Sequence, residues 1–183
     1  MTRITWAGAA LMLALAGCSS PDNKYFTLST EGPAAPASIA AGRTVSVDEV
    51  NIPSYLDRPQ IVVRQGANGA DVHEYERWLE PLDTMLRRVL AADLSARLGV
   101  EHVLDRPGKD TALITVNIDE FGQEGDRVVL RGQWTLKTAG KDGPGVARSF
   151  SREEPLGKSE TPDMVAAMSR LVGGLADEVA GGM

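Results

Sequence analysis

The chain has 183 residues, with 19 Lys and Arg against 25 Asp and Glu, and a net charge of −6. An acidic chain is repelled by nucleic acid and by anionic lipid headgroups. The composition therefore argues against a nucleic-acid partner and against membrane attachment through a basic patch. The single cysteine excludes an internal disulfide.

The first element in the chain is a predicted lipoprotein signal peptide over residues 1–17. Arg3 gives it a positive start, and Trp6–Leu15 is an apolar run of ten residues. A membrane-spanning helix needs about twice that length. Residues 15–18, Leu-Ala-Gly-Cys, resemble the lipobox of bacterial lipoproteins, in which the chain is cut before the cysteine and its thiol is acylated. Cys18 is therefore the predicted lipidation site. The alternative is an ordinary signal peptide with an incidental cysteine.

Residues 18–23 form the predicted acylated tether, and residues 24–183 form one predicted domain, as the length favours. Ser19 follows the acylated cysteine. An aspartate there would resemble the signal that keeps lipoproteins on the inner membrane of Gram-negative cells. Ser19 therefore indicates the outer membrane, with the domain held in the periplasm by acyl chains.

Short strands are expected in the first half of the domain, at Tyr25–Leu28, Val45–Ile52, from Ile61 onward and at Val72–Tyr75. The second of them slips in its alternation at Asp48-Glu49, which predicts a β-bulge. Residues 31–42, rich in Pro and Ala, are expected to form a surface loop. Asn68-Gly69 predicts a hairpin, because both residues tolerate positive φ.

Helical periodicity marks two long helices. The first is expected to begin near Pro81 and to end at Gly99 as its C′ residue. The second is expected to begin with Thr161 as its N-cap and Pro162 as its first residue. Between them, alternating patterns predict strands at Ile114–Ile118 and Val128–Leu136 and an edge strand at Val146–Glu154.

These elements predict an α/β fold: a single-domain sandwich of a mixed, largely antiparallel sheet with two long amphipathic helices. The apolar stripe of the first helix comprises Leu82, Met85, Leu86, Val89, Leu90, Leu94 and Leu98. That of the second comprises Met164, Val165, Met168, Leu171, Val172, Leu175 and Val179.

Little in the sequence could serve catalysis or bind a metal. The two histidines, His73 and His102, lie far apart, whereas a zinc site needs three or four convergent ligands. His73 is expected to be a solvated residue at a strand end. The sequence has no nucleophile elbow, phosphate-binding glycine loop or dinucleotide fingerprint. We therefore expect no enzymatic activity, no metal and no cofactor.

Two segments carry a family resemblance. Residues 50–64 read Val-Asn-Ile-Pro-Ser-Tyr-Leu-Asp-Arg-Pro-Gln-Ile-Val-Val-Arg, and residues 77–82 read Arg-Trp-Leu-Glu-Pro-Leu. Together with the lipobox and the early Tyr-Phe-Thr-Leu strand, they resemble the PqiC/YmbA-type lipoproteins, the ABC-type transport auxiliary lipoprotein family. The resemblance covers nearly all of the mature domain. Leu79 stands where that family usually has alanine.

The resemblance implies a function that composition could not. It points to an outer-membrane lipoprotein that docks the outer end of a tunnel formed by an inner-membrane protein with MCE domains. Such a tunnel moves lipids or other hydrophobic molecules across the envelope. The alternatives are a periplasmic lipid-binding carrier lipoprotein and an envelope-assembly scaffold without a transport role. Aromatic residues make up only 5% of the chain, which weakens the carrier alternative, because lipid cavities are usually lined with aromatics.

The turn between the two prolines holds the candidate contact residues. Tyr55 and Leu56 are expected at its exposed tip, where they could contact a partner or a second copy of the chain. The other motif residues are expected to be mainly structural: Pro53, Asp57, Arg58, Pro59, Gln60, Trp78, Glu80 and Pro81. Asp57 could accept amide hydrogen bonds within its own turn, Arg58 could pair with Asp57 or Glu80, and Trp78 could cover the core.

Overall fold

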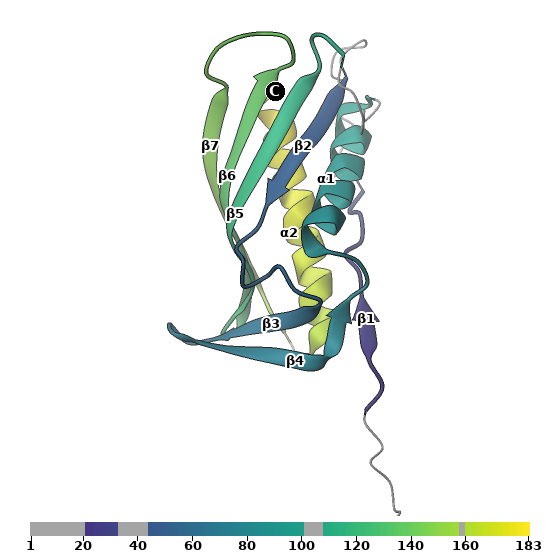
Figure 1. Cartoon of the computed structure of the whole chain (residues 1–183), viewed down its shortest axis with the longest axis vertical. Coiled ribbons are helices and arrows are strands. Elements are labelled where there is room, and N and C mark those ends of the chain that lie inside the picture. The colour runs from purple at the N-terminus through teal and green to yellow at the C-terminus, as the bar shows by residue number, and fades with distance from the viewer. Residues whose placement is uncertain (1–20, 33–43, 101–107, 158–159) are drawn as a thin grey trace, which may run out of the picture.

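The computed structural model describes residues 21–32, 44–100, 108–157 and 160–183. It consists of β1 (Lys24–Phe26), β2 (Val45–Asn51), β3 (Gln60–Gln65), β4 (Gly69–Trp78), α1 (Leu82–Leu98), β5 (Ala112–Glu124), β6 (Arg127–Thr138), β7 (Val146–Pro155) and α2 (Thr161–Gly181). The strands form one mixed seven-stranded sheet, and the two helices pack together on one side of it (Figure 1). The predicted single-domain α/β sandwich is confirmed.

Six strands follow one another in the order β1-β4-β3-β5-β6-β7. The seventh, β2, lies outside this order and pairs with β5. The longest ladders, β5–β6 and β6–β7, are antiparallel, whereas β1–β4 and β2–β5 are parallel. β2 pairs with the first half of β5, and β3 meets the last residue of β5 through Arg64 and Glu124. The β3–β4 hairpin therefore extends beyond the end of β2 (Figure 1), and the segment joining β2 to β3 lies at this junction.

The core lies between the sheet and the helices. Every residue of the two predicted apolar stripes is buried. The inward positions of the central strands are also buried, among them Ile114, Val116 and Trp134. The bulge predicted at Asp48-Glu49 appears as a register shift between Val47 and Glu49. Gly99 ends α1 in the left-handed conformation with φ 62°, as expected.

One local prediction is confirmed with a difference in detail, and two were wrong. The β3–β4 hairpin exists, but its positive φ lies at Gly66 rather than at Asn68-Gly69, because Gly69 already pairs with Gln65 in the ladder. The N-cap of α2 is Glu160, because the hydroxyl of Thr161 donates to Glu76 of β4. His73 is a half-buried residue inside β4, where its Nδ1 lies 2.6 Å from Glu76 Oε2.

Candidate docking surface at the motif turn

The two segments that carry the family resemblance lie side by side. The backbone N–H of Trp78 donates to the carbonyl of Pro59 at 2.7 Å, and Gln60 is the register partner of Arg77. The N–H of Leu79 donates in turn to the carbonyl of Phe26 at 2.9 Å. The turn before β3 is therefore joined to the end of β4 and, through it, to β1.

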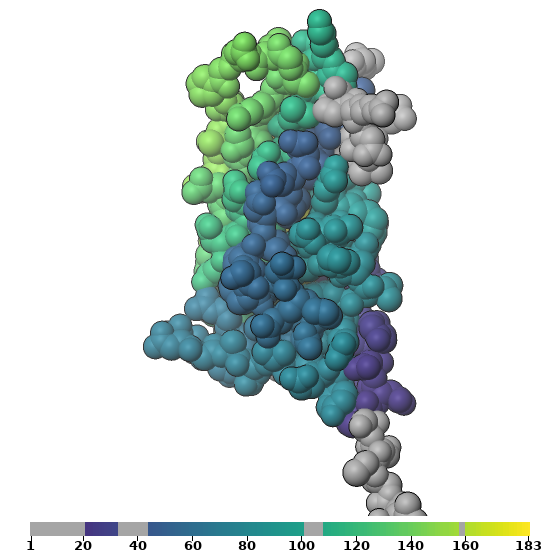
Figure 2. All heavy atoms as spheres, viewed as in Figure 1, coloured from purple at the N-terminus to yellow at the C-terminus, as the bar shows by residue number. Residues whose placement is uncertain are grey.

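Backbone hydrogen bonds close the turn between the two prolines. The N–H of Leu56 donates to the carbonyl of Pro53 at 2.9 Å, and that of Arg58 donates to the carbonyl of Leu56 at 2.8 Å. Each proline fixes its own φ and donates no hydrogen bond, so the segment is stiff by its own chemistry. Figure 2 shows this segment, in dark blue, at the surface above the β3–β4 hairpin.

Leu56 does not lie at an exposed tip, which corrects the prediction for this residue. Its side chain is 4% exposed and belongs to the hydrophobic core. The physical reason is the tightness of the turn, which directs successive side chains to opposite sides. Tyr55 is the side chain left at the surface, with 37% of it exposed. The turn therefore presents one anchor rather than two.

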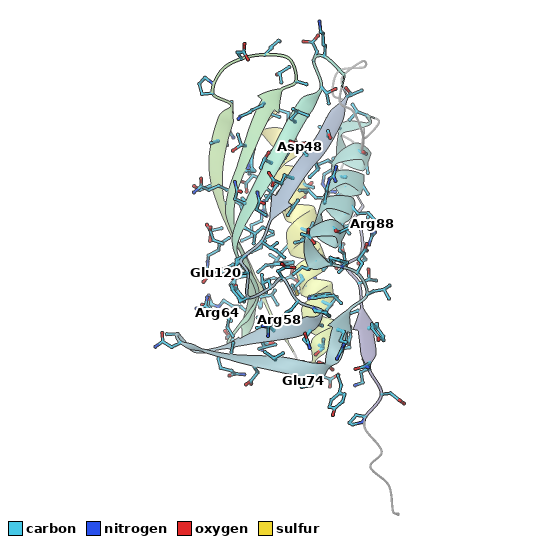
Figure 3. The ribbon with its side chains drawn as sticks, in the orientation of Figure 1. Asp48, Arg58, Arg64, Glu74, Arg88 and Glu120 are labelled. Atoms are coloured by element: carbon cyan, nitrogen blue, oxygen red, sulfur yellow. The ribbon has the colours of Figure 1, made fainter. Side chains whose placement is uncertain are left out.

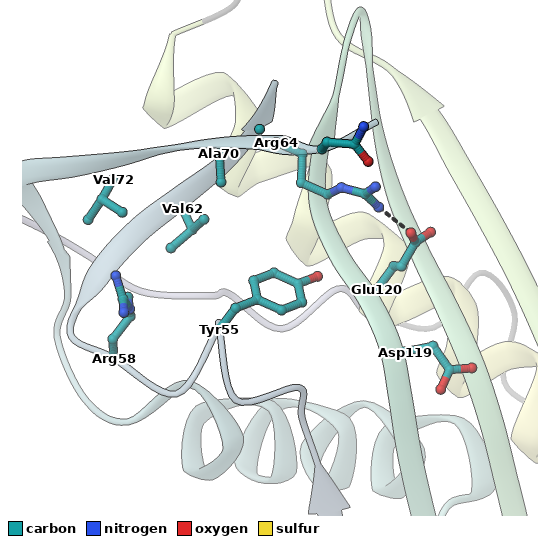
Figure 4. A pocket seen from close by; sticks show the side chains of 10 residues that line it. Tyr55, Arg58, Val62, Arg64, Ala70, Val72, Asp119 and Glu120 are labelled. Atoms are coloured by element: carbon teal, nitrogen blue, oxygen red, sulfur yellow. Dashed lines mark hydrogen bonds and ion pairs between the residues drawn. The ribbon is translucent and has the colours of Figure 1, made fainter. Parts of the chain in front are cut away.

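Tyr55 stands in an open cleft of about 440 Å³ between the turn, the β3–β4 hairpin and β5. Val62 and Val72 supply an apolar wall, and Arg64 and Glu120 lie at the end toward which the Tyr55 ring points (Figure 4). Partial burial raises the pKa of the Tyr55 hydroxyl, and the charge of Glu120 adds to this, while the charge of Arg64 opposes it. The hydroxyl therefore stays protonated and can donate a hydrogen bond.

A network of charges borders this Tyr55 cleft. Glu120 of β5 accepts hydrogen bonds from Arg131 of β6 and from Arg64 of β3, and Arg131 also bonds to Glu124 at 3.2 Å. The hydrogen bond from Arg131, with help from Arg64, lowers the pKa of Glu120, although partial burial opposes the shift. Three strands are thus linked at the rim of the cleft by ion pairs between their side chains.

A second cleft, of about 310 Å³, lies on the other side of Arg58. Asp57 to Pro59 form one wall, and Trp78 to Leu82 form the other. Arg58 lines both clefts, and Figure 3 shows it above the β3–β4 hairpin on the same side of the molecule as Arg64 and Glu120. The predicted pairing of Arg58 with Glu80 was wrong, because Glu80 pairs with Arg88 at 2.5 Å instead.

The remaining motif residues divide into buried and exposed ones. Trp78 is 6% exposed and packs in the core, as expected, and Pro81 is the N-cap of α1. Asp57 is exposed, and within the described ranges its carboxylate has no hydrogen bond, so the predicted amide contacts in its own turn were wrong. Arg58 likewise has no ion pair among the described residues. A charged side chain that is free of internal partners can form contacts with another molecule.

The Arg64–Glu120–Arg131 network was missing from the sequence predictions. Its members come from three strands, and only the strand order brings them together. In β5 a register shift between Ile118 and Glu120 turns Phe121 toward the core and leaves Glu120 half-buried, as the register partner of Arg131. Alternation continued from Ile114, Val116 and Ile118 would have placed Glu120 in the core, so the sequence pattern contained no signal for this pair.

Two predicted sites lie outside the described residues, namely Cys18 and Ser19. No helix of the described part of the chain is long and apolar enough to cross a membrane. In that same part, no group of His, Cys, Asp and Glu side chains is arranged to hold a metal ion.

Comparisons with known proteins agree on one family. The model of the ABC-type transport auxiliary lipoprotein component matches residues 26–180. The intermembrane transport lipoproteins PqiC of Escherichia coli K12 and of Shigella flexneri are each 30% identical over 141 residues, which cover 74% of this chain and 75% of the relative.

Two solved structures share the fold. One is an uncharacterized protein with 24% identity and a TM-score of 0.76, covering 88% of this chain and 99% of the other. The second, from Xanthomonas campestris, has 15% identity and a TM-score of 0.71, covering 86% and 93%. At these identities the likeness concerns the fold alone.

Proposed function

Since the chain belongs to the ABC-type transport auxiliary lipoprotein family, we propose that it completes an MCE-type tunnel between the inner and outer membranes. In this proposal it is an outer-membrane lipoprotein, held on the periplasmic face by acyl chains on Cys18. It docks the outer end of a tunnel protein with MCE domains, through which lipids or other hydrophobic molecules pass. Its role is binding and positioning, without catalysis.

The observation that carries the proposal is the identity of 30% to the intermembrane transport lipoprotein PqiC, over 74% of this chain and 75% of the relative. At this level and coverage, the coarser statement holds plainly: the chain is a lipoprotein component of intermembrane transport. The MCE partner, the outer membrane and the acylation of Cys18 are the further steps that we propose.

The geometry of the motif turn favours docking over carriage of a lipid. A lipid carrier needs a concave and largely apolar pocket. The Tyr55 cleft is open and is bordered by the charges of Arg64, Glu120 and Asp119. A rigid turn that presents an aromatic ring beside a free arginine matches the composition of binding hot spots, which are rich in Tyr and Arg.

We therefore assign the docking contact to Tyr55 and Arg58. The double substitution Tyr55→Ser, Arg58→Ser should weaken the complex with the MCE protein by about 2 kcal/mol or more, which corresponds to about 30-fold in affinity. Both side chains are exposed, so the change in unfolding free energy should stay within about 0.5 kcal/mol. The measurement is co-purification of the partner from native membranes, together with a melting curve of the purified variant.

Val146→Ser is the matched control, because Val146 is also an exposed apolar residue, at the start of β7. It should leave both readouts unchanged. Retained co-purification in the double variant, with an unchanged melting curve, would place the docking surface elsewhere. Leu56 is unsuitable for this test, because replacing a core residue would confuse loss of binding with loss of stability.

A further inference from the structure

Exposed large apolar side chains gather on the paired strands β1 and β4 and on the residue that follows β4. Tyr25 is 58% exposed, Tyr75 45% and Leu79 65%. They are three of the five large hydrophobic side chains that are exposed in the described part of the chain. Singly exposed apolar residues are ordinary, but several on one small surface mark a contact with something less polar than water.

The backbone places these side chains on one face. In the parallel β1–β4 ladder, Phe26 is the partner of Trp78, and Tyr25 is the partner of Arg77. Partners across a ladder share a face, and so do residues two positions apart in a strand. Phe26 and Trp78 pack toward the core, so their neighbours point outward. Leu79 follows the last residue of β4, and its N–H continues the ladder by donating to the carbonyl of Phe26. We call this surface the β1–β4 outer face; it comprises Tyr25, Tyr75, Arg77 and Leu79, and Leu79 also borders the second cleft.

The chemistry of this face fits the headgroup region of a bilayer. Tyrosine has an apolar ring and a polar hydroxyl, and it is enriched where membranes meet water. Arginine can lay its aliphatic stem on apolar surface and keep its charge in water, and Leu79 adds apolar area. With a net charge of −6, the chain gains no general attraction to anionic lipid, so amphipathic contact must carry the interaction.

The length of the tether limits how far this face can lie from the membrane. Cys18 and Lys24 are six positions apart in the sequence, so a fully extended tether spans about 22 Å at most. The strand that follows the tether is β1 itself, at the end of the molecule where β4 also lies (Figure 1). A domain on so short a tether can still tilt. The apolar surface nearest the tether, which is the β1–β4 outer face, then determines which side of the domain contacts the lipid.

We propose that the β1–β4 outer face rests on the headgroup region of the membrane that holds the acyl chains. This inference deepens the proposed function and depends on the acylation of Cys18. It gives the anchored domain a fixed orientation. β1 and β4 lie against the lipid, and the loop that joins β6 to β7, at the opposite end of the molecule, is directed into the periplasm (Figure 1).

The test uses the full acylated protein in vesicles of phosphatidylethanolamine and phosphatidylglycerol. Leu79→Cys and Val146→Cys each introduce one thiol, and Cys18 is the only native cysteine. An environment-sensitive fluorophore is attached to the introduced thiol, and its quenching by iodide is compared in detergent and in vesicles. At position 79, quenching should fall several-fold on transfer to vesicles. At position 146, remote from β1, it should not change.

A second variant links the protection to the face itself. Adding Tyr25→Ser and Tyr75→Ser to Leu79→Cys should restore most of the iodide quenching in vesicles, while the melting curve stays as in the parent. Equal quenching at positions 79 and 146 in vesicles would overturn the proposal. Equally strong protection of position 79 in detergent would also overturn it, because that face would then contact a second copy of the chain.

Mass spectrometry of the labelled protein separates this inference from the proposed anchor. One fluorophore per chain means that the thiol of Cys18 is blocked, whereas two mean that acylation has failed. If acylation has failed, the membrane contact is tested with a replacement anchor. The chain from Ser19 onward, which keeps every described residue, then carries an N-terminal histidine tag that binds it to vesicles containing nickel-chelating lipid. Protection of position 79 there would support the membrane contact, and its absence would overturn it.

Discussion

Arg97 joins three parts of the molecule that are remote in the sequence. Its Nε donates to Asp177 of α2 at 2.5 Å, and its Nη1 donates to the carbonyl of Glu31 at 3.0 Å. The same Nη1 lies 3.5 Å from the carboxylate of Asp93, one turn earlier in α1. Asp93 is 1% exposed, and its Oδ2 has no hydrogen-bond partner in the described structure. The carboxylate is thus held in a site that disfavours its charge.

Burial raises the pKa of Asp93 from 3.8 to about 6, although the charge of Arg97 opposes the shift. At a pH between these two pKa values, Asp93 is largely protonated in the folded protein and largely ionised in the unfolded chain. The free energy of unfolding contributed by Asp93 therefore falls as pH rises from about 4 to about 6, by about 1.4 kcal/mol for each unit of pKa difference. Asp93→Asn should remove this dependence.

The measurement is denaturant unfolding of the parent and of Asp93→Asn at several pH values. The variant should gain stability relative to the parent as pH rises through this window, and the difference should be constant above it. Asp57→Asn serves as the control, because Asp57 is exposed. A parent and variant that differ by the same amount at every pH would show that the pKa of Asp93 does not change on folding.

At the scale of residues, the sequence could identify which segments matter but not where each side chain points. The two prolines correctly predicted a turn between them, yet Leu56 faces the core and Tyr55 does not. A tight turn lacks the regular periodicity that makes burial readable in strands and helices. The link between Arg97 and Asp177 was equally hidden, because it depends on how α1 and α2 pack.

At the scale of elements, Trp134 fixes α2 onto the sheet. It lies on β6 with 0% of its side chain exposed. A Cβ atom added to Gly182 would lie 2.7 Å from the Trp134 ring, so the C-terminal end of the helix packs directly on the indole. The indole N–H lies 3.4 Å from Glu178 of α2, and the guanidinium of Arg148 lies 5.7 Å from the ring centroid.

Trp134→Ala should lower the free energy of unfolding by about 3–5 kcal/mol, because it leaves a large cavity under α2. Gln133→Ala is the matched control: Gln133 is exposed on the opposite face of the same strand, and its effect should be within about 0.5 kcal/mol. Urea unfolding of the three proteins gives the comparison. Equal midpoints for Trp134→Ala and the parent would mean that α2 does not depend on this side chain.

Periodicity made these elements predictable, whereas their order in the sheet was not. Alternation identified the inward side of β5 and β6, and helical spacing identified both stripes. The parallel pairings of β1 with β4 and of β2 with β5 join segments far apart in the sequence. Such pairings depend on the whole arrangement of the sheet, which local patterns do not encode. The β1–β4 outer face was therefore visible only in the folded chain.

At the scale of the whole molecule, the proposed contacts divide between two parts of the surface. The β1–β4 outer face follows directly on the tether, and the motif turn lies beyond it at the junction of β2, β3 and β5. A hydrogen bond from Trp78 to Pro59 joins the two through the end of β4. Arg58 and Leu79 line the same cleft, so the two proposed contacts adjoin each other. A domain anchored through the β1–β4 outer face would therefore present the motif turn close to the membrane surface, where the outer end of a tunnel would reach it.

Docking of the outer end of a tunnel requires that the acyl chains sit in the outer membrane. If Ser19 is the sorting signal that the lipobox resemblance implies, the residue after Cys18 should control which membrane holds the protein. Ser19→Asp should move the protein toward the inner membrane while leaving its acylation intact. Cys18→Ala is the companion variant: it should abolish labelling by radioactive palmitate and leave the chain unprocessed or unanchored, because the acyl chains that we propose on Cys18 would supply the membrane affinity. The measurement is density-gradient fractionation of membranes from cells that express each form. Outer-membrane density for both the parent and Ser19→Asp would show that Ser19 does not act as a sorting signal. Full palmitate labelling of Cys18→Ala would refute the anchor itself.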